Sequence, residues 1–394
     1  MHKNNCFSNF NPCTGCGACY AVCPVSAIFY RLNQKGFYEA FVDEEKCVSC
    51  GKCVKACPKY IQNENQLDKN TFRAYSFVHQ NPSFLAESAS GAAAWALTEM
   101  AISKGYQVVG VEYNHNSNTA RTVCAHTLKE AEKFKGSKYI QADTRIYKEL
   151  LKKSGKFMVF GTPCQLAGLS QAAILQNRRE DFLLVDCLCH GVPSYNVWQK
   201  FLEHIKIKNP ISVSFRSKKG GWHNFFMEIK SADRTYYTDA RKNPFYKLFF
   251  SGLLLNDSCY VCRVKSATYC DIRLGDLWGS KYDLNDRGVS VVLPISERGQ
   301  SWIEKLSNAG CLQDSSCLRS KIVKSQSSFS NKQIKEKQRE KLLTCFTNQP
   351  FEIAFSCYQA GLSKRRYFVN FIKSLCPLFI IKYIRFFVHK IKGY

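Results

Sequence analysis

Residues 13–24 read CTGCGACYAVCP and residues 47–58 read CVSCGKCVKACP, so the pattern Cys-x2-Cys-x2-Cys-x3-Cys-Pro occurs twice, 34 positions apart. This internal repeat predicts two halves of one small module. Between the halves, Ala27 to Tyr30 and Glu39 to Val42 are candidate strands, joined by a turn through Asn33 to Gly36. We therefore expect a separate domain over residues 1–61.

The eight cysteines of the repeat resemble those of bacterial two-cluster ferredoxins, in which the fourth cysteine of each run binds the other cluster. The resemblance covers residues 10–60. It implies two [4Fe-4S] clusters, one on Cys13, Cys16, Cys19 and Cys57, the other on Cys47, Cys50, Cys53 and Cys23. Structural zinc is the alternative, although zinc sites seldom use two such four-cysteine runs.

Composition limits the class of protein. A chain of 394 residues predicts two or three domains. Its 21 cysteines are an odd number, and the first residues, MHKNN, open no apolar signal segment, so we expect a cytoplasmic protein with reduced thiols. The formal net charge is +25, which two clusters would lower to about +21.

A surface this basic attracts an acidic redox partner, anionic lipid, a phosphorylated cofactor or nucleic acid. Nucleic acid is the least favoured of these partners, because the sequence contains no recognised nucleic-acid-binding motif.

Beyond the first module, residues 62–72 are polar and predict a linker. Strand and helix patterns then alternate up to residue 320, which predicts an α+β or α/β fold. We divide this region into parts 73–175 and 176–320, and expect a basic, helical tail over 321–394. The clearest elements are a helix over 91–104, strands over 107–113, 156–160 and 181–186, a helix over 195–207, and weaker strands over 211–216, 225–229 and 289–295.

Several motifs in this central region resemble the coenzyme F420 hydrogenase/dehydrogenase beta-subunit family, and they occur in a shared order. They are Ser88 to Gly91, Lys135 to Tyr139, Phe160 to Gln165, Cys189 to Pro193, Phe215 to Lys218, Cys259-x2-Cys262 and Asp271 to Asp276. The resemblance implies a mixed α/β domain that binds FAD and a further [4Fe-4S] cluster. Coenzyme F420 itself is one of several acceptors that such a domain could serve.

The residues around Cys164 predict a ligand or a reactive thiol on their own. Thr162 can cap a helix and Pro163 suits its first position, which places Cys164 in the first turn, where the helix dipole favours a thiolate. Cys189 follows another strand, and Cys259 and Cys262 have metal-ligand spacing. We expect a third cluster on Cys164, Cys189, Cys259 and Cys262, with Cys187 and Cys270 as substitutes.

No Gly-x-Gly-x-x-Gly follows a strand, so no Rossmann fingerprint marks a flavin site. Residues in the family-like turns are the alternative means of holding a pyrophosphate. They are Ser137, Lys138, Tyr139, Gly161, Thr162, Pro163, Arg216 and Lys218. The scattered Cys6, Cys124, Cys311, Cys317, Cys345, Cys357 and Cys376 are interpreted as small buried hydrophobes.

The C-terminal tail is amphipathic. One helical face carries Ile380, Ile384, Phe387 and Ile391, and another carries Lys382, Arg385, His389 and Lys392. Basic residues interrupt the apolar ones too often for a membrane span. The alternatives are peripheral contact with a membrane and packing against this domain or a partner subunit.

Taken together, these features predict an FAD-dependent iron–sulfur oxidoreductase that passes electrons between ferredoxin-type clusters and a small-molecule acceptor. No individual catalytic residue is identified, and a redox partner protein is expected. The alternative is a non-catalytic electron-transfer subunit of a larger redox complex.

Overall fold

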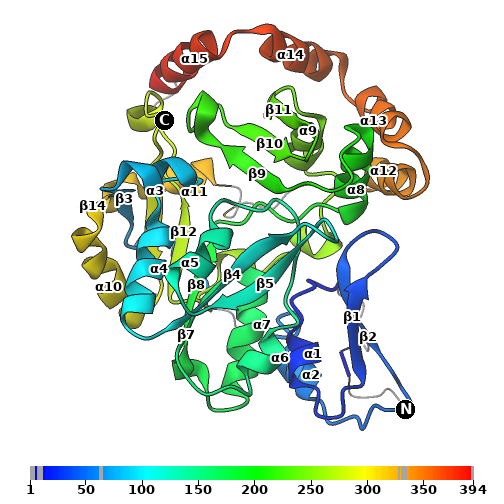
Figure 1. Ribbon diagram of the computed structural model, residues 1–394, viewed down its shortest axis with the longest axis vertical. Coiled ribbons are helices and arrows are strands. Elements are labelled where there is room, and N and C mark those ends of the chain that lie inside the picture. The colour runs from blue at the N-terminus through cyan, green and yellow to red at the C-terminus, as the bar shows by residue number, and fades with distance from the viewer. Residues whose placement is uncertain (1–4, 7–11, 62–64, 327–328, 330–334, 392–394) are drawn as a thin grey trace.

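The computed structural model describes residues 5–6, 12–61, 65–326, 329 and 335–391. It shows a mixed α/β protein with a small N-terminal domain at one side (Figure 1). This domain contains helices α1 (Ala18–Val22) and α2 (Lys52–Ala56) and an antiparallel hairpin of β1 (Ile28–Leu32) and β2 (Tyr38–Val42). The hairpin confirms the two predicted strands, with each strand shifted or extended by one or two residues.

The main body is built on a nine-stranded mixed sheet in the order β14-β3-β13-β12-β8-β7-β4-β5-β6. Strands β4, β7, β8 and β12 run parallel to one another, whereas β13 and β5 flank them in the opposite direction. The strands are β3 (Tyr75–His79), β4 (Gln107–Asn114), β5 (Thr119–Ala125), β6 (Ala142–Asp143), β7 (Phe157–Phe160), β8 (Phe182–Cys187), β12 (Ile272–Asp276), β13 (Ser290–Pro294) and β14 (Gly310–Asp314).

The sheet joins both parts into which we divided the central region, because β3 to β7 come from residues 73–175 and β8 and β12 to β14 from residues 176–320. A second antiparallel sheet, in the order β11-β10-β9, consists of β9 (Ser212–Ser217), β10 (Phe226–Lys230) and β11 (Thr235–Asp239). The predicted strands lie within two residues of the observed ones. Dividing residues 73–320 after position 175 therefore does not assign each sheet to its own part of the chain.

Helices cover the sheets and connect their strands (Figure 1). The predicted helices over 91–104 and 195–207 correspond to α4 and α8. The helices of the body are α3 (Pro82–Glu87), α4 (Ala93–Ser103), α5 (Leu128–Ala131), α6 (Tyr147–Leu150), α7 (Pro163–Ile174), α8 (Tyr195–His204), α9 (Pro244–Ser251), α10 (Glu297–Glu304) and α11 (Arg319–Ser325).

The predicted linker is partly ordered against the body. Gln66 forms a bridge with Ala267, and Phe72 is buried and stacks on Phe329 with ring centroids 6.1 Å apart. Residues 62–64 of the predicted linker lie outside the described residues.

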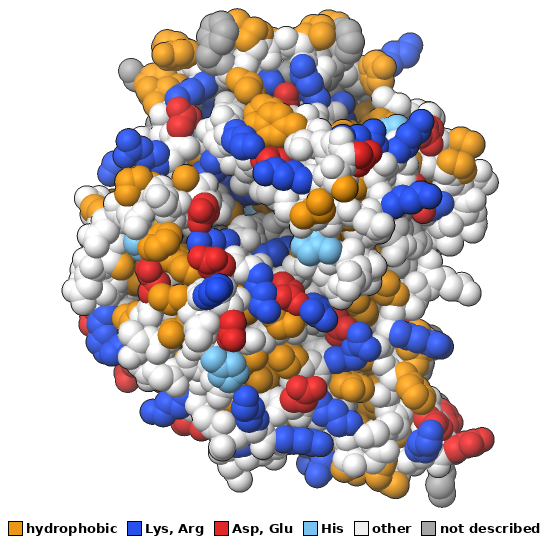
Figure 2. All heavy atoms as spheres, viewed as in Figure 1, with side chains coloured by type: hydrophobic (Ala, Val, Ile, Leu, Met, Phe, Trp, Pro, Cys, Tyr) orange, Lys and Arg blue, Asp and Glu red, His pale blue; other side chains and the backbone are white. Residues whose placement is uncertain are grey.

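The C-terminal segment continues as α12 (Glu336–Asn348), α13 (Phe351–Ala360), α14 (Lys364–Leu375) and α15 (Leu378–Ile391), which follow one another around the edge of the molecule (Figure 1). Hydrophobic side chains lie along the same edge in Figure 2. Among the described residues, no helix is long and apolar enough to cross a membrane. Lys392, predicted to lie on the basic face of the tail, is outside the described residues.

The N-terminal domain packs on the main body through α7, against which α1 and α2 lie. Gly168 is at the centre of this contact, because a Cβ atom placed there would lie 2.8 Å from the Sγ of Cys16 and 2.9 Å from the Cβ of Ala18. Two polar side chains fix the same junction. Thr144 donates to the carbonyl of Cys16 at 2.9 Å, and Gln141 accepts from the amide of Tyr38 at 2.8 Å. The glycine thus permits a close approach of the two domains.

We predict that Gly168→Val disrupts the packing of α7 against the N-terminal domain, because the added side chain overlaps Cys16 and Ala18. Overpacking of this kind costs about 1–3 kcal/mol. Urea unfolding, followed by circular dichroism, should show a lower free energy of unfolding. The control is Gln171→Val on the same helix, where the side chain is only partly buried; equal destabilisation by both variants would contradict the prediction.

Candidate functional site

The second cysteine run and one member of the first surround a common cavity. Cys23, Cys47, Cys50 and Cys53 all line it, together with apolar residues of the hairpin. Cys23 therefore lies with the second run, as the ferredoxin pattern requires for crossed ligation. Cys50 is exposed, so this set of thiols reaches the surface.

Three of the other four cysteines of the repeat are buried, and the fourth, Cys13, is half-buried. Cys16, Cys19 and Cys57 are buried, with exposed fractions of 5%, 8% and 8%. Burial, together with the negative charges of Cys16 and Cys13, raises the pKa of the Cys57 thiol, which shows that Cys57 lies near the first run. Buried thiolates repel one another unless a cation lies among them, so this arrangement fits iron ligation.

Helix α7 begins beside a third group of cysteines. Thr162 precedes the helix, and its amide donates to Oε1 of Gln165 at 3.0 Å, which completes half of a capping box. The hydroxyl of Thr162 lies 3.3 Å from the Sγ of Cys164 in the first turn. The helix end therefore holds Cys164 where unpaired backbone N–H groups favour a thiolate, as its sequence predicts.

The structure brings Cys164, Cys189, Cys259 and Cys262 together. Burial first, then the charges of Cys262, Cys189 and Cys259, raise the pKa of the Cys164 thiol. The turn at Gly191 lies against this group, because a Cβ atom placed there would lie 3.4 Å from the Sγ of Cys259. The amide of Gly191 donates to the Sγ of Cys189 at 3.4 Å. These four residues thus form a candidate third cluster site.

The two substitute cysteines have charged neighbours. Cys270 lies beside the guanidinium of Arg273, whose Nη2 is 3.9 Å from its Sγ. The thiol of Cys187 contacts Cys189, and the charges of Asp186 and Arg273 act on it. Cys187 is therefore placed between the four-cysteine group and a buried ion pair.

Within the described residues, no group of three or more His, Cys, Asp or Glu side chains has the arrangement that holds one metal ion. A [4Fe-4S] cluster binds each of its four thiolates to a different iron, so its ligands are spread more widely than those of a single ion. The three cysteine groups are interpreted in that sense.

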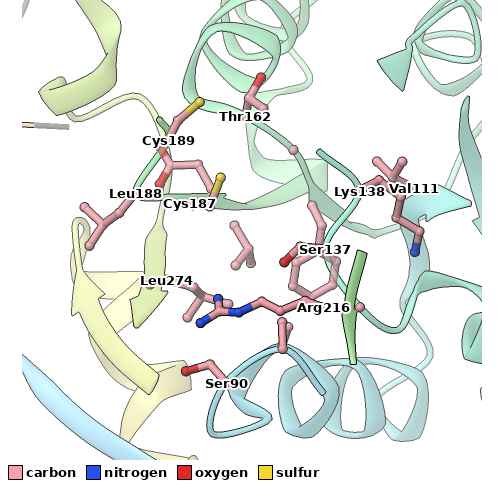
Figure 3. A pocket seen from close by; sticks show the side chains of 18 of the residues that line it. Ser90, Val111, Ser137, Lys138, Thr162, Cys187, Leu188, Cys189, Arg216 and Leu274 are labelled. Carbon is pink, nitrogen blue, oxygen red and sulfur yellow. The ribbon is translucent and has the colours of Figure 1, made fainter. Parts of the chain in front are cut away.

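A cavity of about 400 Å³ adjoins the third cysteine group. Cys187 and Cys189 lie at one end, and Arg216 and Ser90 at the other (Figure 3). The carboxyl ends of β7, β8 and β12 meet along its wall, because parallel strands present these ends at one edge of the sheet. Six of the predicted cofactor residues line it: Ser137, Lys138, Tyr139, Gly161, Thr162 and Arg216.

Arg216 is the most unusual of the cavity residues. Its Nη1 donates to Oδ2 of Asp276 at 2.6 Å, but its Nε and Nη2 are buried and have no hydrogen-bond partner. The residue is 8% exposed. Leaving buried donors unpaired is costly, particularly on a charged group, so the guanidinium is suited to bind an anion in the cavity.

A helix N-terminus adds to the same wall. Ala92 precedes α4 with a φ of 65° and provides no side-chain cap, and Ala93 and Ala94 line the cavity with it. Amide groups of a first helical turn without a cap favour a negatively charged group. Arg216 and α4 therefore offer two kinds of donor to one anionic ligand.

The two predicted lysines are used differently from Arg216. The ammonium of Lys138 donates to the carbonyls of Lys133, Phe134 and Lys135, at 3.0 to 3.1 Å. Burial lowers the pKa of Lys138 to about 7. Its side chain lines the cavity, but its N–H donors bind the carbonyls at the end of a short 3₁₀ helix.

Lys218 and Pro163 are not among the residues that line the cavity. The ammonium of Lys218 donates to the carbonyls of Leu85, Ser90 and Arg287, at 2.8, 2.5 and 2.5 Å. It therefore holds the loop before α4 in place rather than facing a ligand.

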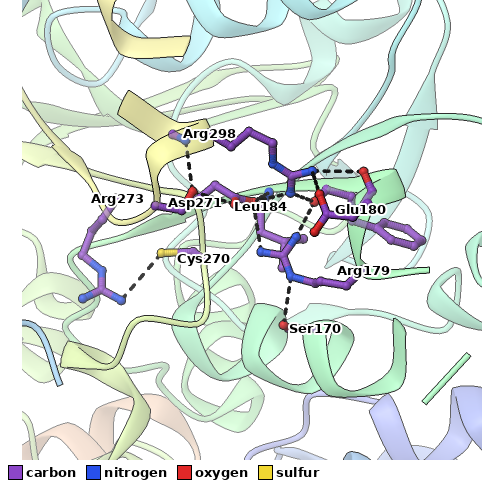
Figure 4. Close-up of polar contacts among 11 residues, drawn as sticks. Ser170, Arg179, Glu180, Leu184, Cys270, Asp271, Arg273 and Arg298 are labelled. Carbon is purple, nitrogen blue, oxygen red and sulfur yellow. Dashed lines mark hydrogen bonds and ion pairs between the residues drawn. The ribbon is translucent and has the colours of Figure 1, made fainter. Parts of the chain in front are cut away.

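Two ion-pair systems with buried carboxylates support the sheet behind the cysteines. Arg273 and Asp186 form a bidentate pair, with both N–O distances 2.7 Å and Arg273 fully buried. Burial disfavours the charge of Arg273, but the Asp186 carboxylate outweighs it and raises the pKa of the guanidinium. Arg179 and Arg298 both bind Oδ2 of Asp271, at 3.1 and 3.0 Å (Figure 4). These charges position the strand that follows Cys270.

The sequence did not identify several residues of this region. Gln326 lines the cavity, and the predicted role of Asp276 as part of a motif did not indicate its ion pair with Arg216. Cys6 is buried beside Cys19 and Cys53, as predicted for a small buried residue. Among the scattered cysteines, Cys311 and Cys317 are exposed, so their predicted burial is wrong. The Sγ atoms of Cys345 and Cys357 lie 3.5 Å apart between α12 and α13. Such contacts join distant positions and leave no periodic pattern.

Comparison with known proteins finds a matching family model for each of two regions of the chain. Residues 12–61 match the 4Fe-4S dicluster domain, and residues 154–317 match the C terminus of the coenzyme F420 hydrogenase/dehydrogenase beta subunit. No curated protein shows significant similarity. A chain in the xenon-derivatised F420-reducing [NiFe] hydrogenase complex from Methanosarcina barkeri is similar at 15% identity and a TM-score of 0.46. The alignment covers 75% of this chain and 94% of that chain.

We predict about twelve irons per chain in anaerobically reconstituted protein, because each of the three cysteine groups would hold one [4Fe-4S] cluster. Cys164→Ser should lower the content to about eight. Cys124→Ser is the matched control, since Cys124 belongs to none of the three groups and its thiol donates to Oε1 of Gln107 at 3.6 Å. Colorimetric iron determination makes the measurement, and about eight irons in the unchanged protein would exclude the third cluster.

Proposed function

We propose that this chain, a member of the coenzyme F420 hydrogenase/dehydrogenase beta-subunit family with an N-terminal 4Fe-4S dicluster domain, is an iron–sulfur flavoprotein oxidoreductase. In this proposal it passes electrons between its clusters and a small-molecule acceptor that binds beside FAD. The observation that carries the proposal is the cavity of about 400 Å³ whose wall includes both Cys189 and the buried, partly unpaired Arg216.

The positions of the three cysteine groups support an ordered path. The group that contains Cys50 reaches the surface, whereas Cys16 is buried against Gly168 of α7. Gly168 is four residues after Cys164, which is about 6 Å along a helix. One turn of α7 therefore separates the first cysteine run from the third group, which in turn adjoins the cavity through Cys189.

The cavity also fits the anionic part of a dinucleotide. Arg216 would pair with a pyrophosphate through Nε and Nη2, while Asp276 holds the opposite side of its guanidinium. The amides that begin α4 would donate to the same group. Lys218 supports this part of the wall by holding the Ser90 carbonyl. These contacts take the place of the missing Rossmann fingerprint.

A flavin bound here would supply the exchange between one-electron and two-electron chemistry. The protein's own contribution is to hold it between the third cysteine group and the open part of the cavity. A chain with clusters but no flavin would instead be an electron-transferring subunit that needs a partner to act on a small molecule.

We predict that anaerobically purified protein contains flavin and that Arg216→Met loses at least nine-tenths of it, because the variant removes both unpaired donors. Arg216→Lys should retain an intermediate amount. Flavin released by acid is measured by fluorescence and compared with iron content on the same sample. Arg121→Met, at an arginine whose side chain is 52% exposed, is the control.

Unchanged iron in Arg216→Met would show that the variant still folds and holds its clusters. Flavin retained in that variant would contradict the assigned site. Absence of flavin from the unchanged protein would remove the enzymatic part of the proposal and leave the electron-transfer subunit.

A further inference from the structure

The last two helices expose an unusual amount of apolar surface. Of the 22 large hydrophobic side chains that are exposed in the described part of the chain, ten lie in α14 and α15. In α15, Ile380, Ile384 and Phe387 are 39%, 51% and 58% exposed, at positions that share one helical face. In a typical surface helix this face would be buried against the protein.

The polar face of α15 is turned toward the protein instead. The ammonium of Lys382 donates to Oδ2 of Asp286 at 2.5 Å, and Nη2 of Arg385 donates to Oδ1 of Asn224 at 3.3 Å. These contacts hold the helix by its charged side. Hydrogen bonds and an ion pair to the body therefore orient the apolar face of α15 outward. The face is not exposed merely because the helix is detached from the body.

Helix α14 presents a similar row. Phe368, Ile372 and Leu375 are 63%, 42% and 64% exposed and are spaced at four and three residues. Just after this helix, the carbonyl of Cys376 accepts from Nη1 of Arg241 at 2.9 Å, which ties the junction of the two helices to the body. The two helices lie one after the other along the same edge of the molecule (Figures 1 and 2).

The charge of this segment is of one sign. Residues 353–394 contain eight Lys or Arg residues and no Asp or Glu. Lys364 and Arg365 are exposed at the start of α14, and the sequence places Lys390 and Lys392 at the far end. Apolar rows flanked by cations match the boundary between the headgroups and acyl chains of an anionic bilayer.

We propose that α14 and α15 form a docking surface for an anionic membrane, with both helices lying in the plane of the bilayer surface. The uniform positive charge favours this occupant over a second copy of the chain, because two such surfaces would repel each other. Docking would hold the main body against the bilayer by the edge that carries the tail.

The test is sedimentation of the full-length protein with sucrose-loaded vesicles of phosphatidylcholine and phosphatidylglycerol in equal amounts. The expected result is binding to these vesicles, much weaker binding to pure phosphatidylcholine, and release as salt is raised from about 0.1 to about 0.5 M. The double variant Ile384→Ser, Phe387→Ser should bind about tenfold more weakly, because two apolar anchors are removed.

The matched control is Ile211→Ser, Phe250→Ser, at residues that are 63% and 55% exposed elsewhere on the body. Iron content checks that each variant is folded. Equal loss of binding in both double variants, or equal binding to neutral and anionic vesicles, would overturn the proposal. So would self-association in analytical ultracentrifugation that the Ile384→Ser, Phe387→Ser variant abolishes, because the face would then bind a second copy.

Discussion

The close approach of α7 to the N-terminal domain is the constraint on which the rest of the arrangement depends. Gly168 lets the Sγ of Cys16 lie against a helix backbone, and the same helix carries Cys164 in its first turn. A side chain at this position would increase the separation between the two cysteine groups. Under the proposed function this short separation favours electron transfer between the two groups, because electron transfer weakens steeply with distance. The bonds from Gln141 and Thr144 keep this junction in one orientation.

Buried charge is the second organising element. Thiolates, and the anionic clusters that they would hold, are costly in an apolar interior unless cations or N–H donors lie close. The structure supplies both, through Arg273 beside Cys187 and Cys270 and through the helix end at Cys164. Arg216 and Arg273 both keep a buried donor without a hydrogen-bond partner, but of the two only Arg216 lines the cavity. That difference separates an arginine that supports the fold from one that is available to a ligand.

The C-terminal helices follow the opposite rule from the body. In the body, most large apolar side chains are buried in the core. In α15 the charged Lys382 and Arg385 contact the protein while Ile384 and Phe387 face outward. Such an orientation costs free energy in water, since the apolar row stays hydrated. Contact of this surface with another apolar phase would remove that free-energy cost.

By itself, the sequence determined the features that depend on local spacing. The two cysteine runs predicted the N-terminal module, and their resemblance to two-cluster ferredoxins implied the crossed position of Cys23. Hydrophobic periodicity placed β4, β7, β8 and α8 within a few residues. Thr162 and Pro163 predicted the helix start that holds Cys164. Six of the eight residues predicted to hold a cofactor line the cavity.

Only the tertiary structure decided which cationic groups are free to bind. Lys138, Lys218 and Arg216 have similar surroundings in the sequence, yet both lysines are bound to backbone carbonyls and only Arg216 keeps buried donors unpaired. The face that α15 turns outward was likewise set by Asp286 and Asn224, about one hundred residues or more away in the chain. Local patterns reflect the 3.6-residue and two-residue periods of helices and strands, whereas such pairings depend on how distant segments pack.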